Sequence, residues 1–294
     1  MNLIVCVKPV PDVSILALNP KTCLIDIDDL VYIINPYDMA AIEEALCIKE
    51  KDAVSHITLL SVAPHSTKRL LRRGLAMGVD EARLLWDSTF NNLDCYATGV
   101  ILAKAINSLK YDLILCGQKA IDTEAGQVSS VIAGELGLPL ASRVSSIDIS
   151  SEGKEVLVQS KLEKGNRLEM EIMLPAVLAV EVDLDEPRYA SLPSLMAGLR
   201  MDIKEYDLAA LGLSKQELEQ KGKMTRTVSL STPKPRPKKL FTPDSSLTAE
   251  ERLRLIMSGG VTQKQGDKLE GDPENIASTV VQYLKAKKFI STIE

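Results

Sequence analysis

The 294-residue sequence lacks most of the residue patterns from which enzyme sites are built. Its two histidines, His56 and His65, have no cysteine or second histidine at ligand spacing, which argues against zinc and iron–sulfur sites. The five cysteines include no Cys-x-x-Cys pair and are odd in number, so we expect reduced thiols. G-x-S-x-G, H-E-x-x-H, Walker and G-x-G-x-x-G motifs are absent, and no general base is evident. The sequence therefore predicts binding without hydrolytic or group-transfer chemistry.

Long apolar runs and an excess of positive charge are missing as well. The apolar run at the start is about six residues long and is followed by Lys8, too short for a signal sequence or a membrane span. We expect a cytoplasmic protein without a membrane-spanning segment. A net charge of −5 argues against nucleic acid as a partner, and a hydrophobic content of 45% suits a folded core.

Short apolar runs alternate with helical patterns in the first part of the chain. The runs lie at residues 3–7, 57–62, 82–86, 111–116 and 176–182. Continuous runs of this length are typical of strands that are buried on both faces of a parallel sheet. The helical patterns between them begin near Pro36, Ser66 or Thr67, Asp94 and Glu124. This alternation predicts an α/β fold with a doubly wound, mostly parallel, Rossmann-like sheet.

The pattern changes after Pro139. Strand-like segments at 144–149, 155–162 and 168–174 are separated by turn residues and predict antiparallel hairpins at the edge of the sheet. We expect a first α/β domain at residues 1–185, followed by a loop at 186–200 and a C-terminal arm at 201–294 that cannot bury its apolar faces alone. In the arm, the prolines at 233–237 favour polyproline II, Thr248 and Glu251 form a capping box, and a last helix begins after Asp272.

Residues 111–139 form the strongest candidate for an anion site. A strand ends at Gly117, a polar loop follows, and the next helix stops at Gly137, which suits a left-handed C-cap. Backbone N–H groups and the positive end of a helix dipole hold phosphates in such loops. The simpler alternative is an ordinary connection between a strand and a helix. The crowding of polar residues favours a site; they are Gln118, Lys119, Asp122, Thr123, Glu124 and Gln127.

Other candidates lie in the loops after the predicted strands, where open α/β sheets bind their ligands. Lys8 suits a phosphate and Asp12 a ribose or an amide, although each is equally explained as a solvated loop charge. Asp38 either reaches an adenine or ribose or is an acid favoured by the helix dipole. Asn35 is more simply a helix cap, and Cys116 is expected to pack as a small hydrophobic residue. Together these residues predict nucleotide binding.

Five motifs, in order, resemble the β subunit of electron transfer flavoprotein. They are IVCVKPVPD, INPYDMAAIEEAL, AMGVDEARLL, GQKAIDTEAGQVSSVIAGELGLP and EPRYASLPSLM. The resemblance implies a heterodimer with an α subunit that carries the electron-transferring FAD. The β subunit would hold AMP in conventional members, or a second FAD in electron-bifurcating members. An acyl-CoA dehydrogenase-like flavoenzyme would supply electrons, which a quinone-linked oxidoreductase or another acceptor would receive.

The resemblance also assigns residues to these roles. The nucleotide contacts would be Val7, Lys8, Asp12, Asn35, Asp38, Ala63, Gly117, Asp122, Thr123, Gln127 and Val128. Leu192, with Leu195 and Met196, would lie in the loop that recognises the dehydrogenase, whereas the alternative for Leu192 is to cover the domain's own core. The arm at 201–294 would pack on the α subunit. Its part from about Leu208 to Gly271 looks longer than is usual in the family.

The nucleotide and the competing functions stay open at this point. Residues 123–125, Thr-Glu-Ala, follow neither the AMP nor the FAD pattern of the family, and the added Glu124 weakens the case for a second FAD. A stand-alone nucleotide-binding stress-type protein or an ATP-using hydrolase would use the same sheet, but would carry its own phosphate-gripping motif and need no tail. A simple dehydrogenase is disfavoured by the missing dinucleotide fingerprint.

Overall fold

The computed structural model describes residues 1–16, 25, 30–91, 93–150, 153–182, 186–214, 216–217, 224–225, 228, 243–257, 271–287 and 289. The chain divides into two compact units, Met1–Ser231 and Thr232–Glu294, and each is described by itself.

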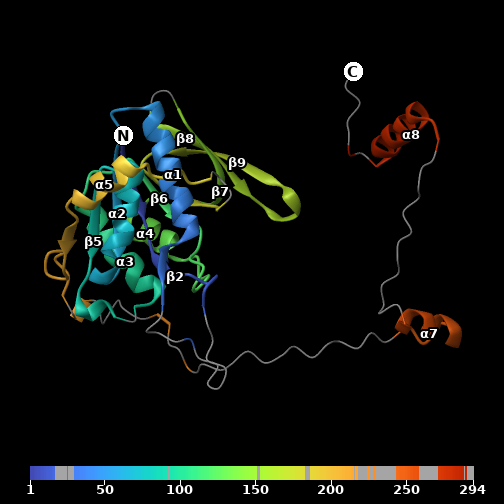
Figure 1. The fold of residues 1–294 in the computed structure, drawn as a ribbon, viewed down its shortest axis with the longest axis horizontal. Coiled ribbons are helices and arrows are strands. Elements are labelled where there is room, and N and C mark those ends of the chain that lie inside the picture. The colour runs from blue at the N-terminus through green and yellow to red at the C-terminus, as the bar shows by residue number, and fades with distance from the viewer. Residues whose placement is uncertain are drawn as a thin grey trace. The chain divides into compact units, whose positions relative to one another are not determined.

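A nine-stranded sheet in the order β11-β5-β4-β1-β6-β10-β7-β8-β9 forms the centre of the first unit (Figure 1). The strands are β1 (Asn2–Cys6), β4 (His56–Val62), β5 (Glu81–Leu85), β6 (Leu113–Gly117), β7 (Leu140–Ile149), β8 (Glu155–Lys161), β9 (Arg167–Met173), β10 (Ala176–Val180) and β11 (Lys204–Tyr206). Pairing is parallel from β11 through β7 and antiparallel from β7 to β9. The predicted fold class and the edge hairpins are confirmed.

Helices cover the parallel strands on both faces. They are α1 (Pro36–Lys51), α2 (Lys68–Met77), α3 (Cys95–Asn107), α4 (Val128–Leu136) and α5 (Leu192–Arg200), with short 3₁₀ turns at His65–Thr67, Ser88–Phe90 and Glu163–Gly165. Successive side chains of a strand point to opposite faces, so β1 contributes to two cores. Leu3 and Val5 pack with residues of α1 and α2, whereas Ile4 and Cys6 pack with residues of α3 and α4.

Two elements differ from the expected ones. The helix expected near Glu124 begins at Val128, because Glu124 and Gly126 have left-handed φ angles of 50° and 59° that interrupt a helix. Residues 204–206, which the sequence places in the C-terminal arm, form β11 and pair with β5 at the edge of the sheet. The sheet thus takes a strand from beyond residue 185, while the proposed domain division itself stays a prediction.

The remaining elements are small. Strands β2 (Pro9–Pro11) and β3 (Tyr32–Ile34) form a separate antiparallel pair. In the second unit, α7 (Ala249–Met257) begins with the predicted capping box between Thr248 and Glu251, and α8 (Pro273–Ala286) follows Asp272 as predicted. The polyproline prediction for 233–237 lies outside the described residues. Across the described ranges, no helix combines the length and apolar character needed to span a bilayer.

Candidate functional site

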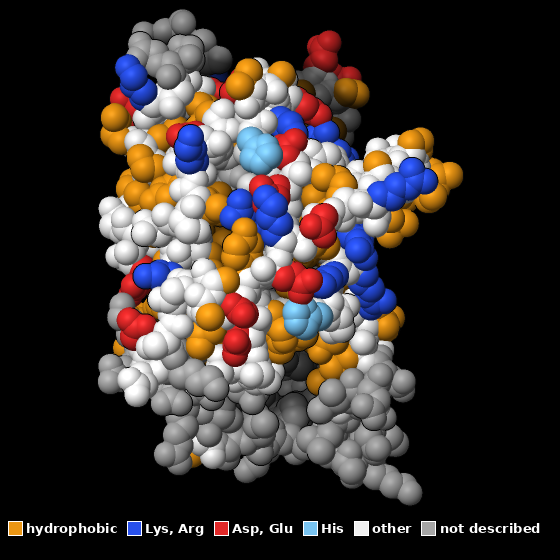
Figure 2. All heavy atoms as spheres, turned by 90° about the vertical axis from the view of Figure 1, so that its left-hand side faces the viewer, with side chains coloured by type: hydrophobic (Ala, Val, Ile, Leu, Met, Phe, Trp, Pro, Cys, Tyr) orange, Lys and Arg blue, Asp and Glu red, His pale blue; other side chains and the backbone are white. Residues whose placement is uncertain are grey.

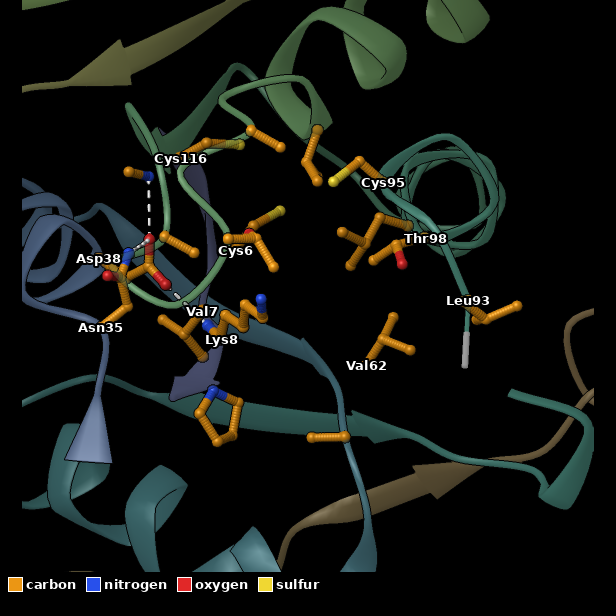
Figure 3. Close-up of a pocket in the computed structure, with 18 of the residues that line it drawn as sticks. Cys6, Val7, Lys8, Asn35, Asp38, Val62, Leu93, Cys95, Thr98 and Cys116 are labelled. Carbon is orange, nitrogen blue, oxygen red and sulfur yellow. Dashed lines mark hydrogen bonds between the residues drawn. The ribbon is translucent and has the colours of Figure 1, made fainter. Parts of the chain in front are cut away.

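A cavity of about 1230 Å³ lies at the carboxyl ends of the central strands. The strand order reverses between β1 and β6, because β4 and β5 follow on one side of β1 while β6 and β10 lie on the other. Ligands of open α/β sheets bind at this reversal point. The close-up in Figure 3 shows side chains from several elements directed toward the same space.

Nine of the predicted nucleotide contacts line this cavity. They are Val7, Lys8, Asn35, Asp38, Ala63, Gly117, Thr123, Gln127 and Val128. Asp122 reaches the site through Lys8, whose Nζ lies 2.7 Å from both carboxylate oxygens. Asp12 is not among the lining residues. Its carboxylate instead accepts bonds from the Ser14 hydroxyl and N–H, which lower its pKa.

The Asp38 carboxylate bridges the carboxyl ends of the central strands β1 and β6. Its carboxylate accepts the N–H of Lys8 at 2.7 Å, the N–H of Gly117 at 3.2 Å and the side-chain amide of Asn35 at 3.0 Å. The side chain is buried, and burial raises its pKa to about 7, whereas the three donors oppose that rise by stabilising the carboxylate. Asp38 therefore ties the backbone at the carboxyl ends of β1 and β6 to the first turn of α1.

Asn35 does not act as the expected helix cap. It holds the N-cap position of α1, yet its side chain makes no cap hydrogen bond to that helix. Its amide instead donates to the carbonyl of Lys119 at 2.9 Å, and its oxygen accepts the N–H of Ile121 at 3.2 Å. Asn35 thus fastens the loop after β6 to the start of α1.

The N-terminus of α4 is the candidate phosphate position. Gln127 and Val128 line the cavity, and the N-cap residue Gln127 makes no side-chain cap bond. By contrast, the N-terminal N–H of Ala97 in α3 is capped by the carboxylate of Asp94. The positive end of α4 is therefore free of a capping acid and is suited to an anion.

The other end of α4 is as predicted. Gly137, the C-cap residue, has a left-handed conformation with φ 66°.

Part of the cavity lining is apolar. The lining includes Val62, Trp86, Phe90 and Leu93, here called the apolar wall, and Figure 3 shows Val62 and Leu93 across the cavity from Asn35 and Asp38, with Thr98 on the same side. These residues were missed because apolar residues at strand ends and in loops carry no polar signal. The available signal was position, since Trp86 directly follows β5 at the same edge of the sheet.

Three thiols also line the cavity. Cys6 and Cys116 are register partners on β1 and β6, and both are buried and free. A hydrogen bond with Cys6 and burial raise the pKa of the Cys116 thiol, and burial raises that of Cys95. Cys116 packs in the apolar core as predicted, but its tip is also part of the cavity wall.

A second feature is the apolar face of α5, here called the α5 surface: Leu192, Leu195, Met196 and Leu199. Their side chains are 72%, 41%, 48% and 59% exposed. The alternative that Leu192 covers the domain's core is therefore wrong. Figure 2 views the side of the molecule on which α5 and β5 lie in Figure 1, and it shows apolar side chains at the surface among charged ones.

Comparison with known proteins gives a consistent result. The electron transfer flavoprotein domain model matches residues 22–211. Electron transfer flavoprotein subunit beta of Megasphaera elsdenii is 35% identical, with 99% of this chain and 100% of the relative aligned. Caffeyl-CoA reductase-Etf complex subunit CarD of Acetobacterium woodii is 36% identical over 73% of this chain and 81% of the relative. Protein FixA of Azotobacter vinelandii is 33% identical over 81% and 86%.

The Megasphaera protein aligns with this chain nearly from end to end, whereas the Acetobacterium protein aligns with 73% of it. The expectation that the segment from about Leu208 to Gly271 is longer than usual stays a prediction. The family match covers more than half of the chain and includes the strands and loops that build the cavity. The chain therefore belongs to the electron transfer flavoprotein β-subunit family.

Proposed function

We propose that the chain holds an adenine nucleotide in the cavity and, as one half of a heterodimer with an α subunit, passes electrons from a flavoenzyme partner through the FAD of that α subunit. The observation that carries the proposal is the position of the cavity. It lies at the strand-order reversal of a sheet that belongs to this family, and it has a helix N-terminus on its wall. The chain itself supplies binding and positioning.

In this proposal the phosphates bind at the N-terminus of α4. Lys8 and Lys119 also line the cavity, and each is paired with an acid of the loop after β6, Lys8 with Asp122 and Lys119 with Glu124, so the N–H groups of α4 are the main attraction for the phosphates. The acid that the sequence singled out as unfavourable, Glu124, is 2.9 Å from the ammonium of Lys119, so its charge is compensated in the loop itself. Asp38 holds the backbone of Lys8 and Gly117 in place and is not expected to contact the nucleotide, because both of its oxygens already accept N–H groups.

Size and polarity favour FAD over AMP as the occupant. Typical small-molecule sites measure about 300–1,000 Å³, and this cavity exceeds that range. A mononucleotide would leave the apolar wall uncovered, whereas the flat ring system of a flavin can lie against Val62, Trp86, Phe90 and Leu93. The relative named as a subunit of a caffeyl-CoA reductase-Etf complex supports a flavoenzyme partner that acts on CoA esters.

The nucleotide is tested by its release. The chain is co-expressed with its α subunit, the purified heterodimer is denatured, and the released FAD and AMP are counted per dimer. We expect two FAD and no AMP. One FAD with one AMP would show a conventional nucleotide site and refute the choice of FAD, and one FAD alone would refute nucleotide binding by this chain.

Docking of the partner is tested at Leu192. Burying such a side chain in a partner's pocket contributes roughly 1.5–3 kcal/mol, so we expect Leu192→Ala to weaken docking about tenfold or more without changing flavin content. The measurement is the rate of flavin reduction against the concentration of a short-chain acyl-CoA dehydrogenase reduced with its acyl-CoA substrate. Leu168→Ala is the control, since Leu168 is 44% exposed on β9 at the opposite edge of the sheet. Equal kinetics in the wild type and Leu192→Ala would refute the docking role.

A further inference from the structure

The segment that leads into α5 is fastened to α1 by one arginine. Arg188 lies four residues before Leu192, and its Nε donates to the carboxylate of Glu43 at 2.8 Å. A second guanidinium nitrogen lies 2.7 Å from the same carboxylate, and the backbone N–H of Arg188 donates to it at 2.9 Å. The remaining nitrogen donates to Glu50 at 2.5 Å. Arg188 therefore binds α1 through both its backbone and its side chain.

The contacts follow one face of α1. Glu43, Cys47 and Glu50 have the spacing i, i+4, i+7, so they lie in a row along the helix. The guanidinium of Arg188 touches all three, with its contact to the sulfur of Cys47 at 3.9 Å. The planar guanidinium group has several N–H donors and can bond to all three side chains at once, whereas a lysine ammonium is too compact to reach more than one of them. The position is thus specific for arginine.

Burial makes the pairing obligatory for Glu43. Its side chain is only 6% exposed, whereas that of Glu50 is 61% exposed. A buried carboxylate requires a charged or hydrogen-bonding partner, and Arg188 supplies it. Because Glu43 is buried, it cannot itself touch a docking protein.

The other end of α5 is fixed on a different helix. A side chain at Gly198 would lie 3.0 Å from backbone atoms of Arg72 and Ala76, so the absence of one lets α5 approach α2 closely. Between the two attachments, Ser191 begins the helix by accepting the N–H of Ser194. One side of α5 therefore packs on α2, while the segment before the helix is attached to α1 and the apolar side chains of the α5 surface stay exposed.

We propose that Arg188 is the positioning residue of the α5 surface: its grip on Glu43 and Glu50 sets where Leu192 and its neighbours are presented to the partner flavoenzyme. This inference rests on the docking role proposed above. Arg188 acts through the placement of α5 and does not serve as a contact for the partner.

The test separates placement from stability. Arg188→Ala leaves the buried Glu43 charge without its partner, so a defect in that variant has two explanations. Arg188→Ala combined with Glu43→Gln removes the buried charge as well, which restores stability but not the attachment. Arg188→Lys keeps the positive charge but removes the guanidinium group. Glu43→Gln alone weakens the bond between Arg188 and α1 by removing the charge of the buried carboxylate. Arg167→Ala, at an exposed arginine on β9, is the matched control.

The heterodimers are compared by flavin content, thermal unfolding and reduction by the same acyl-CoA dehydrogenase. For the double variant we expect wild-type flavin content and a near-wild-type unfolding midpoint. We also expect a roughly tenfold higher half-saturating dehydrogenase concentration, with an unchanged limiting rate. Arg188→Lys and Glu43→Gln should shift the half-saturating concentration in the same direction by less. If the double variant does not fold, Arg188→Lys and Glu43→Gln test the inference by the same increase in the half-saturating dehydrogenase concentration.

Three outcomes would overturn the inference. Wild-type docking in the folded Arg188 variants, together with a defect in Leu192→Ala, removes the positioning role and leaves the docking function standing. A defect in the Arg188 variants but not in Glu43→Gln makes Arg188 a direct contact. Wild-type docking in Leu192→Ala removes the docking function and the role of Arg188 with it.

Discussion

Asp38 is the residue whose charge bears most on the site. Its carboxylate bonds to both central strands, and burial raises its pKa from 3.8 to about 7. Between these values the folded protein binds a proton that the unfolded chain has released. The contribution of this group to stability is therefore present at low pH and is lost as the pH rises through about 7.

The Asn variant makes this pH dependence measurable. Asp38→Asn does not titrate, so the stability advantage of the wild type over the variant should shrink by about 2 kcal/mol between about pH 5 and about pH 8. Urea unfolding of both heterodimers at the two pH values measures the difference. An advantage that grows with pH would show that the N–H groups of Lys8 and Gly117 keep the carboxylate ionised against the effect of burial.

Side-chain partners across long sequence separations could not be predicted from the sequence. Asn35 before Pro36 has the local pattern of a helix cap, and only the fold brings the carbonyl of Lys119 within reach of its amide. Asp12 has the position of a ligand residue, but the nearby Ser14 satisfies its carboxylate. Local rules identified both as polar loop positions. The partners of Asn35 depend on the packing of β6 beside β1, whereas the partner of Asp12 is only two residues away in the sequence.

At the scale of elements, the close packing of β6 on α1 depends on a missing side chain. A Cβ at Gly117 would lie 2.2 Å from a carboxylate oxygen of Asp38 and 2.7 Å from the Cβ of Tyr37. Gly117→Ala must therefore push β6 and α1 apart, and we expect it to lower the free energy of unfolding by about 1–3 kcal/mol or more.

Gly134→Ala is the matched control for this variant. Nothing lies within 4 Å of a Cβ at Gly134, which is inside α4, so we expect alanine there to raise stability by about 0.4–1 kcal/mol. Thermal unfolding of the two variants measures the contrast. Equal midpoints would mean that the loop after β6 can move aside without cost.

Elements with a strong periodic or capping signal could be predicted, and those without one could not. The apolar runs placed the buried strands, and Gly137 marked the end of α4 because it tolerates a positive φ. The start of α4 was misplaced because the left-handed conformation of Glu124 is rare for a residue with a side chain. Strand β11 was missed because its sequence, KEY, is short and mostly polar, and its pairing with β5 depends on tertiary packing.

For the whole molecule, the cavity is a place where separate elements meet. Its lining comes from the ends of β1, β4 and β6, the loop after β5, and the first turns of α1, α3 and α4. A ligand that contacts all of them binds the folded state and not the unfolded chain. It raises the free energy of unfolding by RT ln(1 + [L]/Kd), which is about 2.7 kcal/mol when the ligand is present at 100 times Kd. We therefore expect the heterodimer to lose stability when the nucleotide of this chain is removed.

Added ligands show which part of the nucleotide is responsible. Thermal unfolding of the stripped heterodimer is followed with FAD, AMP or adenosine added at equal concentrations. Because the proposed phosphate position is the N-terminus of α4 beside Lys8, AMP should raise the midpoint more than adenosine. FAD should raise it further, since a flavin also covers the wall formed by Trp86 and Leu93. Equal midpoints with AMP and adenosine would show that α4 does not hold a phosphate.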